Sequence, residues 1–278
     1  MCHSWRDTFI SRPSFWVRLD FANVDKTRTY IQRSQSSPLD LLLGYNRVTD
    51  DAFGPVITHV HRLKSLTVNT HSLSSVLRHF RRYTPLLEKL DIQINTPLNP
   101  VLDSALFSGD LSSLRELRLD GVITRLLWKN LTNLRLVNLQ TYCNTYDTTQ
   151  ILDFFESAPL LHTVFLQYWA QSSTDAPPER TVPLRHLQVL TVDADPPHPT
   201  LLRHLYIPIG APLILKFHMF GEDSLLLDYI RESSRNLADQ AGTSTCLLTW
   251  NTVGFSPCTC LTAKSSTLAA IPFRQSRG

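Results

Sequence analysis

A six-residue phrase with aliphatic residues at its first, fourth and sixth positions occurs seven times in this chain of 278 residues. The copies are Leu63/Leu66/Val68, Leu87/Leu90/Ile92, Leu114/Leu117/Leu119, Leu134/Val137/Leu139, Leu161/Val164/Leu166, Leu187/Leu190/Val192 and Leu202/Leu205/Ile207. Their starts lie between 15 residues (187 to 202) and 27 residues (87 to 114) apart. The fourth and sixth residues of an extended chain point to the same side, so each phrase predicts a short strand with one buried face.

An aliphatic phrase at this period is typical of a leucine-rich-repeat solenoid. We therefore predict an α/β fold over residues 46–220: a leucine-rich-repeat solenoid with a parallel sheet and irregular helices or loops on its convex side. A single repeat cannot bury its apolar face alone, so the repeats must stack on one another. The stack leaves one long concave surface, and such surfaces usually hold another macromolecule.

Two of the segments between the phrases predict helices. The first has helical spacing, with Ser72 as its N-cap, and its apolar residues are Leu73, Val76, Leu77 and Phe80. The second follows a capping-box pattern at 147–150, and its apolar residues are Ile151, Leu152, Phe154 and Phe155. The shorter segment 121–130 has no room for a full helix. Strands that alternate with such crossovers are expected to run parallel.

The regular pattern weakens after Ile207. Residues 212–220 could supply one more strand, and residues 221–240 predict a C-terminal helix with Leu226, Leu227 and Ile230 on one side. No repeat phrase and no sustained period continue through residues 241–278. We expect this tail to be poorly ordered or to form an irregular end of the array.

Charge and composition indicate which kinds of partner and which cellular compartment to expect. A formal net charge of +3 without a concentrated basic stripe gives no case for nucleic-acid binding. No apolar run is long enough to span a membrane, and the first residues lack the hydrophobic region of a signal peptide. The scattered Cys2, Cys143, Cys246, Cys258 and Cys260 suit a reducing compartment. We expect a cytoplasmic or nuclear protein.

The sequence lacks the motifs of the common catalytic and metal sites. It has no nucleophile-elbow motif, no phosphate-binding glycine loop and no dinucleotide fingerprint. No pair of Cys-x-x-Cys units supplies four zinc ligands. We therefore expect neither enzymatic activity nor a cofactor nor a metal.

The third, fifth and seventh positions of each phrase should face away from the core, on the face that we call the open face, which in a solenoid is the concave one. The partner-binding candidates on it are Asp91, Arg118, Leu136, Asn138, Phe165, Val189, Thr191 and Tyr206. Charged candidates come from the earlier phrases and apolar ones from the later phrases. Apolar residues that face solvent from strands need a reason. Either a partner protein binds them, or a loop or the C-terminal tail covers them.

The N-terminal segment adds a family resemblance. Cys2-His3-Ser4-Trp5-Arg6, then Ser11–Trp16 and Leu19-Asp20, resemble the last helix and exit segment of an F-box. The order of this segment and the leucine phrases is similar to the fungal F-box proteins with C-terminal leucine-rich repeats. The resemblance divides the front of the chain into a partial F-box (1–22) and a connecting segment (23–45).

The resemblance implies a protein-recognition module that is the substrate receptor of a Skp–cullin–F-box ubiquitin ligase. Its partners would be a protein substrate, the Skp adaptor and cullin. The leucine-proline opening of the F-box is not within the sequence, so the family's main adaptor-binding residues have no counterparts here. Trp5 and Trp16 either contact the adaptor directly or seal the first repeat. The alternative function is a leucine-rich-repeat interaction scaffold that works without a ligase.

Overall fold

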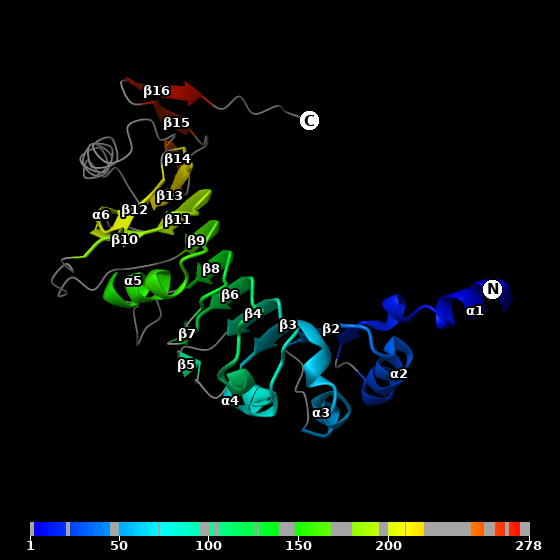
Figure 1. The fold of residues 1–278 in the computed structure, drawn as a ribbon. Helices are drawn as coiled ribbons and strands as arrows, with labels where there is room; N and C mark the ends of the chain where they lie inside the picture. Colours follow the sequence, from blue (N-terminus) through cyan, green and yellow to red (C-terminus); the bar gives the residue numbers. More distant parts are fainter. Residues whose placement is uncertain are drawn as a thin grey trace. The chain divides into compact units, whose positions relative to one another are not determined.

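The computed structural model describes residues 3–20, 23–44, 50–71, 73–94, 101–102, 106–124, 126, 128–138, 148–167, 180–194, 200–208, 210–219, 246–252, 259–264 and 267–272. The chain divides into two compact units, Met1–Asn130 and Leu131–Gly278. Both are α/β and are built around parallel strands (Figure 1). The predicted α/β class and the parallel pairing of successive strands are therefore confirmed.

The sheet of the first unit has the order β1-β2-β3-β4-β6, with every described pair parallel. Its strands are β1 (Arg18–Asp20), β2 (Leu39–Leu43), β3 (Leu63–Thr70), β4 (Lys89–Ile94) and β6 (Glu116–Asp120). A separate parallel pair joins β5 (Val101–Leu102) to β7 (Ile123–Thr124). The first three phrases thus form β3, β4 and β6 in chain order. β1 lies within residues 1–22, which the sequence predicted to be a partial F-box. β2 lies within the predicted connecting segment, residues 23–45. Both strands extend the sheet.

The helical elements of the first unit connect these strands. They are α1 (His3–Ile10), η1 (Pro13–Trp16), α2 (Val24–Ser34), α3 (Asp50–Ile57), η2 (Val60–Arg62), α4 (Leu73–Leu77), η3 (Arg78–Phe80) and η4 (Leu106–Gly109). Figure 1 shows α2, α3 and α4 on the same side of the strands. The predicted helix at 73–80 is confirmed as α4 followed by η3; its expected cap, Ser72, lies outside the described residues.

The aliphatic positions of the phrases lie in the core of the first unit. Leu66, Leu90 and Leu117, which stand at the fourth positions, are at most 2% exposed. Successive phrases are also joined by the backbone just before each strand, where the Glu88 amide donates to the Lys64 carbonyl (2.9 Å). The Arg115 amide donates to the Glu88 carbonyl in the same way (2.8 Å). Each added strand therefore satisfies backbone groups of its neighbour as well as burying apolar area.

Arg62 joins the turn after α2 to the start of β3. Its side chain is 7% exposed and donates to the Ser37 carbonyl through Nε (3.0 Å) and Nη2 (2.7 Å). Nη2 also donates to the Ser34 hydroxyl (2.8 Å). Burial lowers the pKa of the Arg62 guanidinium. These bonds fix the N-terminal segment against the first phrase.

His59, at the turn before η2, makes the stability of the first unit depend on pH. Burial lowers the pKa of His59, and the charges of Arg62 and His61 lower it further. In the unfolded chain the pKa of a histidine is about 6.5. The unfolded chain therefore binds more protons than the folded chain at mildly acidic pH. Stability should therefore fall as the pH drops through this value towards the folded pKa. Urea unfolding measures the free energy of unfolding across this pH range. This free energy should depend less on pH in His59→Gln than in the control His186→Gln. An equal pH dependence in both variants would contradict the role of His59.

The second unit has its own run of parallel strands, in the order β8-β9-β11-β13-β14. They are β8 (Asn133–Val137), β9 (Thr163–Gln167), β11 (Val189–Ala194), β13 (Leu213–Met219) and β14 (Cys246–Thr252). β15 (Thr259–Lys264) and β16 (Thr267–Pro272) follow as antiparallel neighbours. The phrases at Leu161 and Leu187 form β9 and β11, and the strand expected near 212–220 is β13.

Three expectations for the second unit need comment. The seventh phrase does not join the main run: it forms α6 (Thr200–Arg203) and β12 (Leu205–Tyr206), which pairs with β10 (Val182–Pro183). Its apolar residues Leu202, Leu205 and Ile207 are buried. The tail, which has no sequence period, contains β14, β15 and β16. The helix expected at 221–240 lies outside the described residues.

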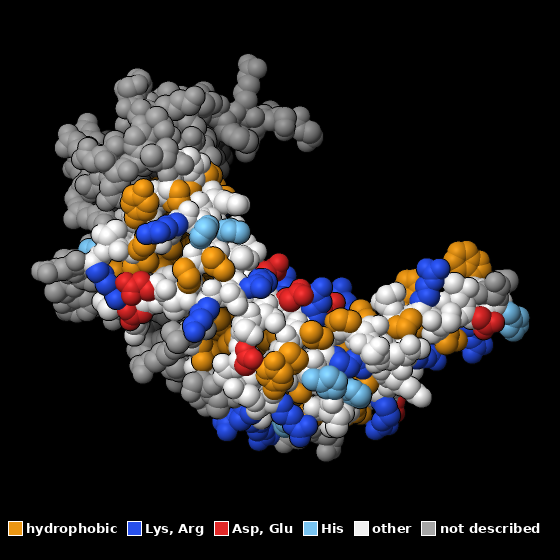
Figure 2. Space-filling model, viewed as in Figure 1, with side chains coloured by type: hydrophobic (Ala, Val, Ile, Leu, Met, Phe, Trp, Pro, Cys, Tyr) orange, Lys and Arg blue, Asp and Glu red, His pale blue; other side chains and the backbone are white. Residues whose placement is uncertain are grey.

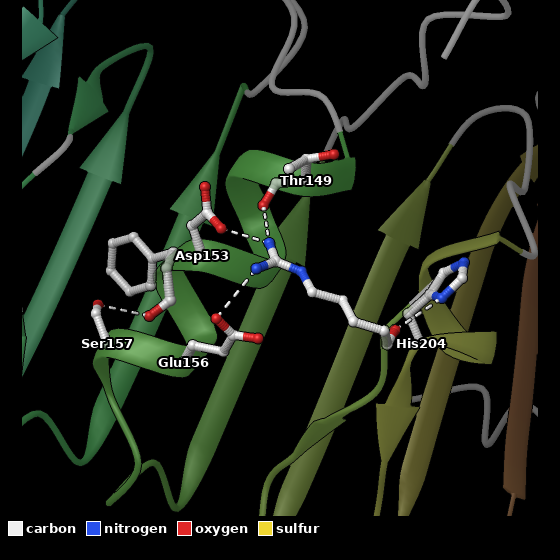
Figure 3. Close-up of polar contacts among 7 residues, drawn as sticks. Thr149, Asp153, Glu156, Ser157 and His204 are labelled. Carbon is white, nitrogen blue, oxygen red and sulfur yellow. Dashed lines mark hydrogen bonds and ion pairs between the residues drawn. The ribbon is translucent and has the colours of Figure 1, made fainter. Parts of the chain in front are cut away.

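The predicted helix after residue 147 is confirmed as α5 (Thr148–Ser157). Arg180 binds its exposed residues Asp153 and Glu156, and Figure 3 shows these two carboxylates and Thr149 on the helix. Ile151, Leu152, Phe154 and Phe155 are buried on the other face. The Arg180 guanidinium donates to Asp153, to Glu156 (3.1 Å) and to the Thr149 carbonyl (3.1 Å), and the hydrogen bond with Asp153 raises the pKa of Arg180. His204 Nδ1 lies 3.0 Å from the Arg180 carbonyl oxygen. Arg180, which lies just before β10, therefore links α5 to His204, the residue before β12.

Removing this link should have a modest and salt-sensitive effect. Arg180→Gln is expected to lower the free energy of unfolding by about 1 kcal/mol, because the three acceptors lie at a partly exposed site. The loss should shrink in high salt. Denaturant titrations at low and high ionic strength measure it, with Arg185→Gln as the matched control; an equal loss in both variants would contradict the role of Arg180.

Candidate functional site

The open face of the first unit carries a row of paired charges. In-register pairing places Thr67 beside Asp91 and Asp91 beside Arg118. Arg118 Nε lies 3.9 Å from Asp91 Oδ1, and Arg118 Nη2 lies 3.8 Å from Asp120 Oδ2. Gln93 donates to the same Asp91 oxygen (3.2 Å). The predicted Asp91 and Arg118 are thus brought together, at distances that leave the ion pairs longer than hydrogen bonds.

A second row of charges lies one step towards the beginning of the strands. Lys89 Nζ and Glu116 Oε2 are 3.1 Å apart, and both side chains are about half exposed. Together with Arg18, Asp40 and Lys64 they line a depression of about 540 Å³. Figure 2 shows acidic and basic side chains intermingled over the strands of this unit. This surface suits a polar partner that carries both signs of charge.

The register of the fourth phrase differs from the prediction. Leu134 pairs with Val164, and Leu136 pairs with Leu166. Leu131, Leu134 and Leu136 therefore occupy the first, fourth and sixth positions, three residues earlier than expected. Leu136 was predicted on the open face and is 0% exposed, so that prediction is wrong. Asn138 is exposed, but it lies beyond the end of β8 with a φ of 50°.

The corrected register places Arg135 on the open face, at the position that Asn138 was expected to take. Arg135 pairs with Phe165, which in turn pairs with Thr191, and Thr191 pairs with Ile214. The Arg135 guanidinium lies over the Phe165 ring, 4.2 Å from its centroid. Arg135 and Ile214 were missed by sequence reasoning. An overlapping Leu131/Leu134/Leu136 reading of the fourth phrase would have revealed Arg135.

The remaining candidates of the second unit divide between two places. Phe165 and Val189 are half-buried on the open face, as predicted, whereas Thr191 is only 9% exposed. Tyr206 is 47% exposed but stands on β12, outside the main run of strands. It lines a depression of about 630 Å³ with Pro183, Arg185 and Pro208. The prediction that Tyr206 lies with Phe165 on the open face is therefore wrong, because β12 pairs with β10 in a separate sheet.

The two N-terminal tryptophans have different environments. Trp16 is 7% exposed and packs edge-on against Tyr30, with ring centroids 5.0 Å apart. Its indole nitrogen donates to the Phe9 carbonyl (3.2 Å), and the Arg33 guanidinium lies 4.5 Å from its ring centroid. Trp5, on α1, is 74% exposed. The position of Trp16 suits the sealing role, and that of Trp5 does not.

Metal binding and membrane insertion are two further properties to consider. Within the described residues, no group of three His, Cys, Asp or Glu side chains could hold a metal ion. Over the same residues, no helix combines the length and apolar character needed to cross a bilayer. The side chains of all five cysteines lie outside the described part of the chain.

Comparison with known proteins adds no family to this description. No family model matches the chain, and no curated protein or solved structure does either.

Proposed function

We propose that both units belong to a leucine-rich-repeat solenoid and that its open face binds another protein. The observation that carries this proposal is the in-register parallel pairing of strands that come from successive phrases. This pairing buries the first, fourth and sixth positions and places the third and fifth on the opposite face of the sheet. Charged pairs on β4 and β6, and the Arg135–Phe165 pair on β8 and β9, supply recognition groups on that face.

The partner protein would be a ubiquitination substrate, with the chain as the receptor subunit of a Skp–cullin–F-box ligase in the cytoplasm or nucleus. The F-box resemblance of residues 1–22 suggests this role, and the exposed aromatic residues of α1 and η1 support it. Trp5 is 74% exposed, and Phe9 and Phe15 are each 48% exposed. The Phe9 and Phe15 rings stack at 4.6 Å. Exposed aromatic groups of this kind are typical anchors of a protein interface, and we assign them to the adaptor.

A second candidate function is an interaction scaffold that works without a ligase. The packing of Trp16 favours it, because Tyr30 and Arg33 already satisfy this side chain within the chain itself. On this alternative the N-terminal aromatic residues close the end of the array, and the open face alone carries the function. The two candidates differ in whether adaptor and cullin associate with the chain.

Co-purification tests the leading proposal. The tagged chain, expressed in cells that contain adaptor and cullin, should recover both proteins. Trp5→Ala should reduce their recovery about tenfold, as expected when an interface anchor is removed. The matched control is Tyr83→Ala, which removes another exposed aromatic residue (53% exposed) of the same unit. Failure of the unaltered chain to recover adaptor would support the scaffold, and unchanged recovery with Trp5→Ala would remove α1 from the interface.

A further inference from the structure

The stacked pair of Arg135 and Phe165 is the most distinctive feature of the open face of the second unit. The two residues face each other across β8 and β9, and the guanidinium carbon lies 4.2 Å from the ring centroid. A cation held over an aromatic face is attracted by the ring quadrupole. Stacking also restricts the rotamers of the long arginine side chain, so its planar fork is oriented before any partner arrives.

Among the described residues, the guanidinium of Arg135 has no hydrogen-bond acceptor. It makes no hydrogen bond and no ion pair with any residue that the structure describes; its one contact of this kind is the Phe165 ring. The Lys89 ammonium and the Arg118 guanidinium of the first unit, by contrast, each face a carboxylate. An exposed fork of five N–H donors with a fixed plane is the arrangement that binds a carboxylate through two parallel hydrogen bonds.

The surroundings of this fork are partly apolar. From Arg135 the row runs through Phe165, Thr191 and Ile214, and these three side chains carry no carboxylate. Val189, one row away, is also half-buried. Asp193, on the other side of the row, is 6% exposed and already engaged in another interaction. The exposed Arg135 guanidinium therefore lies beside an apolar strip formed by Phe165, Val189 and Ile214.

We propose that this surface is a subsite for an acidic residue that lies next to an apolar residue in an extended segment of the partner protein. The Asp or Glu carboxylate binds the Arg135 fork, and the apolar side chain covers Phe165, Val189 and Ile214. The proposal rests on the proposed function in that it takes the open face as the protein-binding surface. It adds the class of sequence that this surface selects.

Peptide binding to the purified full chain tests the subsite. The probe is a short fluorescein-labelled peptide with a Glu-Phe pair between glycine and serine flanks, followed by fluorescence anisotropy. The Gln-Phe and Glu-Gly versions should each bind at least about tenfold more weakly, because the first loses the charge-assisted pair and the second loses apolar contact. A phosphoserine-Phe version separates carboxylate from phosphate as the preferred anion.

Variants of the chain complete the test. Arg135→Gln should abolish the preference for Glu-Phe over Gln-Phe, and Arg135→Lys should weaken it, since lysine keeps the charge but not the planar fork. Arg185→Gln, another exposed arginine of the same unit, should leave it intact. Circular dichroism verifies that each variant is folded.

Several outcomes would overturn the proposal. They are equal binding of the Glu-Phe and Gln-Phe probes, undiminished preference in Arg135→Gln, binding of the phosphoserine probe alone, and no binding of any probe. None of these results depends on adaptor or cullin. A failed subsite with normal adaptor recovery would leave the ligase proposal standing, and the reverse result would leave the subsite standing.

Discussion

Alanine at Leu136 is expected to lower the free energy of unfolding by about 2–5 kcal/mol, the usual range for a buried leucine. Leu136 is 0% exposed and pairs with Leu166 in the interior. Truncation removes apolar contacts and leaves a cavity that the neighbouring β9 cannot readily close. Chemical denaturation monitored by circular dichroism measures the change.

Two control variants show whether this loss comes from the strand register. Leu160→Ala removes a leucine that is 37% exposed in the same unit, and it should change stability by less than about 0.5 kcal/mol. Arg135→Ala alters the residue just before Leu136 and should also have a small effect. If Leu136→Ala were as mild as Leu160→Ala, Leu136 would face solvent and the register of β8 would be the one first expected from the sequence.

Alanine at Arg62 should produce the second large loss, about 2–4 kcal/mol. The variant removes three hydrogen bonds that the charged guanidinium donates. The Ser37 carbonyl and the Ser34 hydroxyl then lose this donor. Because Arg62 connects the end of α2 to the start of β3, the loss should also loosen the N-terminal segment. Hydrogen exchange should therefore rise in α2 and β2.

Arg82→Ala is the matched control for Arg62. Arg82 is exposed, and among the described residues its one hydrogen bond is a long one to the Ile57 carbonyl (3.4 Å). Its removal should cost no more than about 0.5 kcal/mol. Comparable losses in the two variants would show that the bonds of Arg62 contribute little beyond those of a surface arginine.

The sequence predicts the strands correctly where only one set of aliphatic residues fits the six-residue phrase. Leu66, Leu90 and Leu117 fit a single reading, and all three lie in the core of the first unit. β2 was missed because Leu39, Leu41 and Leu43 alternate over only five residues and do not fit the longer phrase. Alternation of this length is a weak signal on its own.

The candidate site was less predictable, because an error in register changes which side chains reach solvent. Residues 131–139 contain two overlapping phrases, and spacing alone cannot choose between them. A shift of three residues moved Leu136 into the core and brought Arg135 to the surface. Trp16 contacts Tyr30 and Arg33, and Arg180 contacts α5. The residues in these contacts are distant from one another in the sequence, so a local spacing pattern cannot predict them.

Paired cysteines test most directly whether successive phrases lie side by side in register. In a background with the native cysteines replaced by serine, Thr67→Cys and Asp91→Cys should form a disulfide under mild oxidation, because neighbouring strands are about 4.8 Å apart. Thr67→Cys with Arg118→Cys should not, since one strand lies between them and doubles the separation. Rapid cross-linking of the first pair alone is the predicted result. Equal cross-linking of both pairs, or of neither, would contradict the account.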